Sequence, residues 1–154
     1  MSTEQEFVDR LNTALSWELA GIVQYMHHAT MLTGPDRAHF EDFFLEGSRE
    51  ARQHAETVSN KIVVFGGVPT VEPARIRRAT EVEDMFEAAL TLEEDALDAW
   101  EAALDASDVA NQGTQFWLED HISEEQEHVD ELRTLTRKVK FGDGDLEDVS
   151  SASG

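Results

Sequence analysis

The segment LSWELAGIVQY, residues 15–25, carries the pattern that decides the fold. Its apolar residues Leu15, Ile22 and Tyr25 recur at helical spacing, which predicts an amphipathic helix. Glu18 lies on the same apolar face. Because an unpaired carboxylate is costly to bury, Glu18 needs a compensating partner inside the fold.

The apolar periodicity extends far beyond this segment. Apolar positions repeat every three or four residues over four long stretches, at roughly 5–32, 37–65, 81–106 and 111–139. Gly34-Pro35-Asp36 separates the first two, and Asn111-Gln112-Gly113 lies near the break between the last two. Residues 66–80 hold two of the three prolines and read as a long connection along the outside of a bundle. The sequence predicts an all-α four-helix bundle with a crossover between the second and third helices.

Length and composition predict one soluble domain. The 154 residues are 40% hydrophobic, with no run of about 18 apolar residues that would suit a membrane span. We assign residues 1–141 to the bundle and expect residues 142–154, GDGDLEDVSSASG, to form an acidic, mobile tail. The polar N-terminus lacks the layout of a secretion signal and the chain has no cysteine, so we expect a cytoplasmic protein without disulfides.

The charge balance restricts the partners. The chain has 33 acidic and 12 basic residues and a formal net charge of -21. Such a surface repels phosphate backbones, so we expect no nucleic acid on it. It is typical of a halophilic protein, whose self-repulsion is screened by salt, and it also attracts cations.

The second half of the chain repeats the arrangement around Glu18. Glu93 also lies among apolar neighbours at helical spacing, from Phe86 to Trp100. The fourth helix carries Glu125 and His128, three residues apart on one face, and the second helix carries Glu50 and His54, four residues apart. The intervals match, since Glu18 precedes His54 by 36 residues and Glu93 precedes His128 by 35.

This residue set predicts a metal centre. One Glu from each of two helices, with a Glu and a His from each of the other two, is the donor set of a di-iron carboxylate bundle. Carboxylate oxygens with two imidazoles suit iron or manganese, and two divalent cations would neutralise the inward carboxylates. Metal is thus the compensation that we expect for Glu18, with iron as the expected ion and manganese or zinc as possible substitutes.

Other interpretations remain open for single residues. Glu18 could be a buried acid paired with Arg49 or Arg52, and Glu94 rather than Glu93 could point inward. His54 could be an ordinary core histidine. We expect His27, His39 and His121 at the surface or as core partners, and we do not propose His28 as a ligand.

The motifs resemble those of the ferritin-like superfamily. From about residue 4 to 139 the chain looks like a bacterioferritin, in LSWELAGIVQYMHH, in FGGVPT after the second helix and in EEQEHVDEL of the fourth. The resemblance implies that Glu18 and Glu93 are terminal iron ligands and that Glu125 is a bridging ligand. It also implies that His54 and His128 are the imidazole ligands, and that Tyr25 lies close to the di-iron centre.

The chain departs from the bacterioferritin pattern at two places. Three residues before His54 it has Ala51 where bacterioferritin has Glu, and the nearest acid is Glu50. The archaeal Dps-like ferritins resemble this chain here, so we keep Glu50 as a ligand and suggest a π-bulge that would aim it at the metal. The second departure is Arg52, which stands where bacterioferritin has its haem-binding methionine, so we expect no haem.

The resemblance implies iron storage and detoxification by a ferroxidase. Such a protein oxidises Fe(II) with O2 or H2O2 and deposits ferric mineral in a hollow homo-oligomeric shell. The tail after residue 141 does not resemble the fifth helix of 24-subunit shells, which favours a Dps-like dodecamer over a 24-mer. Two alternatives stay open: a ferritin-fold di-metal oxidase or peroxidase that stores no iron, and a metal-free acidic helical interaction module.

Overall fold

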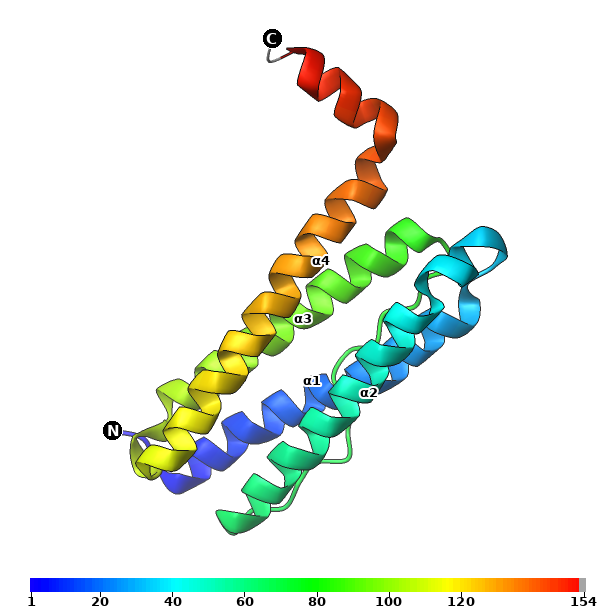
Figure 1. The fold of residues 1–154 in the computed structure, drawn as a ribbon. Coiled ribbons are helices and arrows are strands. Elements are labelled where there is room, and N and C mark those ends of the chain that lie inside the picture. The colour runs from blue at the N-terminus through cyan, green and yellow to red at the C-terminus, as the bar shows by residue number, and fades with distance from the viewer. Residues whose placement is uncertain (153–154) are drawn as a thin grey trace.

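Four long helices make up the fold of the computed structural model (Figure 1). They are α1 (Glu4–Met31), α2 (Gly34–Val64), α3 (Val82–Asp105) and α4 (Gln112–Ala152), with a short 3-10 helix η1 (Ser107–Val109) before α4. The structure describes residues 1–137 in full and residues 138–152 by their helical backbone alone. The predicted all-α bundle is confirmed. The expected tail of residues 142–154 lies outside the fully described residues and stays a prediction.

The helix ends follow from local chemistry. Thr3 caps α1 through its side-chain oxygen, which accepts from the Glu6 amide, while the Glu6 carboxylate accepts from the Thr3 amide. α2 begins at Gly34, earlier than the sequence indicated, because proline is tolerated in the first helical turn, where its missing N–H has no partner to lose. Gly34 enters the helix at a φ of +60°, which glycine adopts without a steric cost.

The crossover between α2 and α3 runs along α1. Asn12 holds it at one point, donating to the Val68 carbonyl and accepting from the Thr70 amide. Further along, the Ala74 amide donates to the Ser16 carbonyl and the Arg77 amide donates to Gln24. These contacts confirm the predicted path outside the bundle and make α2 and α3 run in the same direction.

The core consists of two apolar clusters. One contains Phe7, Leu11 and Trp100, and the other contains Phe44 and Phe86, all fully buried. Glu93 lies midway along α3, seven residues from both Phe86 and Trp100. The two clusters therefore leave the middle of the bundle for polar side chains, and this is where the candidate site lies.

Candidate metal centre

Glu18 is buried at the middle of α1 with three partners around its carboxylate. Its side chain is 6% exposed, and Oε1 accepts a hydrogen bond from the Trp100 indole N–H over 3.1 Å. His54 Nδ1 lies 3.6 Å from Oε2 and His121 Nε2 lies 3.8 Å from Oε1. Burial alone would raise the pKa of Glu18, but the two histidines lower it to about 2, so the carboxylate is charged.

No arginine pairs with Glu18 among the described residues. Arg49 instead contacts Glu46 at the surface over 3.2 Å, and Arg52 is exposed. The alternative that Glu18 is a core acid neutralised by one of these arginines is therefore wrong.

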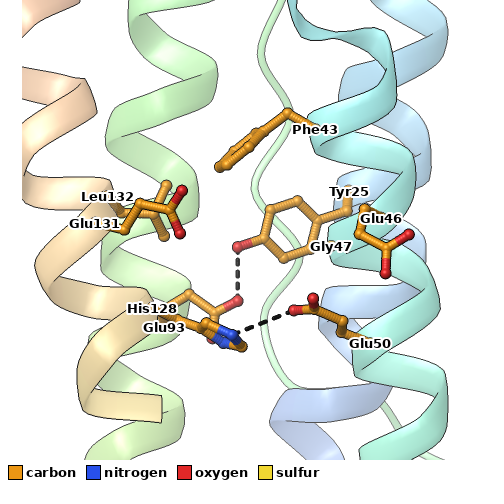
Figure 2. Close-up of a pocket in the computed structure, with 9 residues that line it drawn as sticks. All are labelled: Tyr25, Phe43, Glu46, Gly47, Glu50, Glu93, His128, Glu131 and Leu132. Carbon is orange, nitrogen blue, oxygen red and sulfur yellow. Dashed lines mark hydrogen bonds and ion pairs between the residues drawn. The ribbon is translucent and has the colours of Figure 1, made fainter. Parts of the chain in front are cut away.

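Glu93 points inward from α3 and meets Tyr25 from α1. The Tyr25 hydroxyl donates to Glu93 Oε1 over 2.6 Å, a contact drawn in Figure 2. Burial, and next the nearby Glu93 charge, raise the pKa of Tyr25 well above its usual value, so the phenol keeps its proton. Glu94 lies on the exposed side, where it contacts Arg133 over 3.8 Å. The inward carboxylate is thus Glu93, as the apolar neighbours in the sequence indicated.

Glu125 is the most deeply buried acid of the site. It is 1% exposed, and its Oε1 has no hydrogen-bond partner among the described residues. Burial, and then the neighbouring charge of Glu93, raise the pKa of Glu125 well above its usual value. His128, three residues further on α4, places Nδ1 4.0 Å from Glu125 Oε2.

Glu50 lies at the rim of this group. Its Oε2 is 3.3 Å from His128 Nε2, and its side chain is 40% exposed (Figure 2). α2 is α-helical throughout Gly34–Val64, so the suggested π-bulge at Glu50 is wrong. Ala51 is buried instead, facing the close approach of α2 to Gly21 of α1, where a Cβ on Gly21 would lie 3.1 Å from Ala51 Cβ.

The predicted ligands come together in the bundle. A small inner cavity is lined by Glu18, Glu50, His54, Glu93, Glu125 and His128. Their donor atoms form two groups, each within 4.8 Å, and Glu125 belongs to both. One group holds Glu93, Glu125 and His128, and the other holds Glu18, His54, Glu125 and also His121. Glu50 is in neither group, so its predicted role as a ligand stays a prediction.

His121 belongs to the donor group that holds Glu18, although the sequence analysis expected it at the surface or as a core partner. It is 7% exposed and packs against Trp100 with the rings tilted by 42° and 3.8 Å between their centroids. The signal was present, because His121, Glu125 and His128 follow at intervals of four and three and so share one face of α4.

A wider cavity at the surface shares Glu50, Glu93 and His128 with the inner cavity. Figure 2 shows Tyr25 and Gly47 on one side of it and His128 on the other. Three acidic residues, Glu46, Glu50 and Glu131, stand at this opening and give it a negative potential that attracts cations. The residues that line it are Tyr25, Phe43, Glu46, Gly47, Glu50, Glu93, His128, Glu131 and Leu132.

The fold and this site define a ferritin-like bundle. The model of the ferritin-like domain family matches residues 8–141, so the chain belongs to that family. A bacterioferritin from Brucella melitensis is 31% identical over 148 residues, covering 93% of this chain and 91% of the relative.

Solved structures show the same likeness. A ferritin-like di-iron carboxylate protein from Bacillus anthracis superposes with a TM-score of 0.82 at 30% identity, covering 88% of this chain and 99% of the other. A bacterioferritin from Rhodobacter capsulatus, described with a metal-free dinuclear site and haem iron, gives a TM-score of 0.82 at 27% identity. That comparison covers 92% of this chain and 91% of the other.

No helix in the described part of the chain has the length and apolar content to cross a membrane.

Proposed function

We propose that the protein is a ferroxidase that takes Fe(II), oxidises it with O2 or H2O2, and stores ferric mineral inside a homo-oligomeric shell. The observation that carries this proposal is the pair of donor groups, one mostly buried and one half-buried, that share the buried Glu125. Family membership and similarity to bacterioferritins and a di-iron carboxylate protein support it.

The residues suit a pair of divalent cations. Among the described residues, Glu125 Oε1 and His121 Nε2 are buried without hydrogen-bond partners, and a cation would satisfy both. Burial, and then the crowding of neighbouring acids, raise the pKa of Glu125, and added positive charge would relieve that crowding. Carboxylate and imidazole donors fit iron and would also accept manganese or zinc.

Each side chain then has a distinct role. Glu18 and His54 would hold one ion, Glu93 and His128 the other, while Glu125, with Glu50 at the rim, would contact both. Bound iron supplies the redox chemistry, since each Fe(II) can give up one electron to the oxidant. Tyr25 keeps its proton and fixes the direction of the Glu93 carboxylate, and the acidic opening draws Fe(II) toward the site.

The donor environment does not favour a metal-free interaction module. Such a bundle would pair its buried acids with arginines, whereas Glu18 faces His54, His121 and Trp100, and Glu93 faces Tyr25. A di-metal oxidase that stores no iron would differ from the proposed ferroxidase only in the fate of the ferric product. Measuring whether ferric mineral is retained therefore distinguishes the two functions.

We also propose the cellular setting. The exposed Arg52 offers no thioether for haem iron, so the protein would lack haem. The net charge of -21 argues against nucleic acid on the outer surface and suits a halophilic cytoplasm. The dodecamer stays the proposed shell, with a 24-mer as the other outcome of a mass measurement.

The test combines metal content, oxidation and assembly. Metal-free protein mixed with Fe(II) without oxygen should bind about two ions per subunit tightly, the number that two donor groups can hold. Added O2 or H2O2 should give ferric absorbance that co-elutes with an assembly of 17.3 kDa chains. Glu93→Ala should lose oxidation, and the surface neighbour Glu94→Ala should keep it. Wild-type protein that binds no iron would refute the proposal, and rapid oxidation without retained mineral would favour the oxidase.

A further inference from the structure

His121 is buried against the candidate metal centre, and one of its ring nitrogens has no hydrogen-bond partner in the part of the chain that the structure describes. Its side chain is 7% exposed, its ring lies 3.8 Å from the Trp100 ring centroid, and the His54 ring is edge-on at 4.4 Å. Nε2 has no hydrogen-bond partner among the described residues. Leaving a buried polar atom unpaired is unfavourable, so this placement needs a compensating interaction.

The nitrogen is directed at Glu18. His121 Nε2 lies 3.8 Å from Glu18 Oε1, beyond hydrogen-bonding distance, and that oxygen already accepts from the Trp100 N–H. Trp100 therefore positions both side chains, through a hydrogen bond to Glu18 and ring contact with His121. The remaining gap between the nitrogen and the carboxylate is suited to an ion that both could bind.

We propose that His121 is a seventh metal ligand and that it makes the two metal positions chemically unequal. This inference rests on the proposed di-metal function. Glu18, His54 and His121 offer donors within 4.8 Å of one another and of Glu125, a set of two imidazoles and two carboxylates. The second position has one imidazole, from His128, with Glu93 and Glu125.

The difference in donors predicts a difference in affinity. Imidazole nitrogen binds Fe, Co, Ni and Zn well, and affinity at a nitrogen-containing site rises from Mn²⁺ toward Cu²⁺. The position next to His121 should therefore fill first and release its ion slowly. The position next to His128 should exchange more readily, because it lacks the second imidazole and its histidine is 31% exposed.

The metal position next to His121 has a surface opening of its own. A second surface cavity is lined by His54 and His121 and by the acidic residues Asp120 and Glu124, with Trp117 at its wall. An ion could reach this position without passing the opening at Glu46 and Glu131. These two separate openings agree with two metal positions that each take up an ion independently of the other.

Cobalt(II) titration of the metal-free protein tests the inference, because bound Co(II) reports its ligands by absorbance. Wild type should bind two ions in two steps. His121→Phe, which keeps a planar ring against Trp100 but has no donor, should weaken the tighter step about tenfold to a hundredfold and leave the weaker step within twofold. His128→Phe should weaken the other step, and the exposed His39→Phe should change neither. Circular dichroism should confirm that each variant is folded.

Two outcomes would overturn the inference in different ways. If His121→Phe binds both ions like wild type while His54→Phe loses the tighter step, the di-metal site stands but His121 is no ligand. If wild type binds no Co(II), Zn(II) or Fe(II), the proposed function fails as well.

A second measurement needs no variant. Proton NMR of the Co(II)-loaded wild type should show three exchangeable, strongly shifted imidazole N–H signals, from His54, His121 and His128. Two such signals would overturn the role of His121.

Discussion

The Trp100 indole N–H donates to Glu18 Oε1 over 3.1 Å, joining residues that are 82 positions apart in the chain. This bond, with His54 and His121 near the same carboxylate, makes the buried charge of Glu18 favourable. Glu125 has the opposite situation, because one of its oxygens is buried with no hydrogen-bond partner in the described part of the chain and Glu93 crowds it. Two carboxylates of one site therefore have opposite effects on the metal-free fold.

We expect Glu18→Gln and Glu125→Gln to change the stability of the metal-free protein in opposite directions. The folded-state pKa of Glu18 is about 2, below its ordinary value of 4.5, so its charge stabilises the fold above pH 4.5 and this stabilisation is lost as the pH falls toward 2. Removing it should cost up to about 3 kcal/mol at pH 7.

The raised pKa of Glu125 means that this group destabilises the fold at neutral pH, so Glu125→Gln should stabilise it by about 1–3 kcal/mol. Urea unfolding of both variants at pH 7 measures the difference. Glu94→Gln is the surface control, and equal shifts in the two buried variants would contradict the assignment.

The hydroxyl of Tyr25 should control the oxidation rate through Glu93. Tyr25→Phe removes the 2.6 Å hydrogen bond that fixes the carboxylate, so the Fe(II) oxidation rate should fall about tenfold, the equivalent of about 1.4 kcal/mol. Stopped-flow absorbance of ferric iron measures the rate.

Gly47 gives an independent test of the same contact. A Cβ at Gly47 would lie 2.9 Å from Tyr25 ring atoms, so Gly47→Ala must displace the ring and should slow oxidation as Tyr25→Phe does. Gly113→Ala is the matched control, because its Cβ would meet only Asn111 Oδ1, at 3.7 Å. An unchanged rate in Gly47→Ala with the ring displaced would show that the phenol has no positioning role.

His28 should make the metal-free protein sensitive to mild acid. It is fully buried against Phe44 and its ring nitrogens have no hydrogen-bond partner among the described residues. Burial lowers its pKa from 6.5 to about 4, so between these pH values the unfolded chain binds the proton better. Stability should fall as the pH falls through this window, by up to about 3 kcal/mol.

Urea unfolding at pH 7, 6, 5 and 4 compares wild type with His28→Leu, in which this part of the pH dependence should disappear. Met26→Leu, at an exposed neighbouring position that does not titrate, should keep the wild-type slope. A His28→Leu curve parallel to wild type would contradict the assignment.

The bundle and most of its polar centre could be predicted from the sequence because both depend on local periodicity. Apolar spacing placed Glu18 and Glu93 on inward faces, and two loop breaks defined the helix pairs. The partners of Glu18 could not be predicted, since Trp100 and His121 reach it only after α1, α3 and α4 pack together. Without them, the sequence offered only a metal ion or an arginine, Arg49 or Arg52, as the compensation for Glu18.

His121 was not predicted as a ligand for a related reason. The apolar residues at helical spacing around His121 are also the ones that place Glu125 on the inward face. Periodicity alone therefore does not distinguish a histidine ligand from a core histidine. The identity of its neighbours decides this, and two of them, Glu18 and His54, come from the other half of the chain. Local pattern thus gives the direction of a side chain, but tertiary packing gives its chemistry.

The acid of α2, Glu50, lies four residues before His54 and not three. In a regular helix Glu50 lies at the rim, 3.3 Å from His128 Nε2, while Ala51 is buried and lines the inner cavity. If Glu50 bridges the two ions, Glu50→Ala should slow Fe(II) oxidation as much as Glu125→Ala. Adding Ala51→Glu to Glu50→Ala should then restore activity, because it brings a carboxylate to the inward position.

The added carboxylate should also lower the stability of the metal-free protein, since it brings another acid into a site where burial and neighbouring acids already raise the pKa of Glu125. Metal should reverse that loss, so the gain in melting temperature on loading with Co(II) should be larger in the double variant than in wild type. Ala55→Glu, one turn further along α2 and also buried, is the control that should destabilise without restoring oxidation. If Glu50→Ala instead oxidises iron at the wild-type rate, α2 contributes only His54, and the rim carboxylate serves to attract cations.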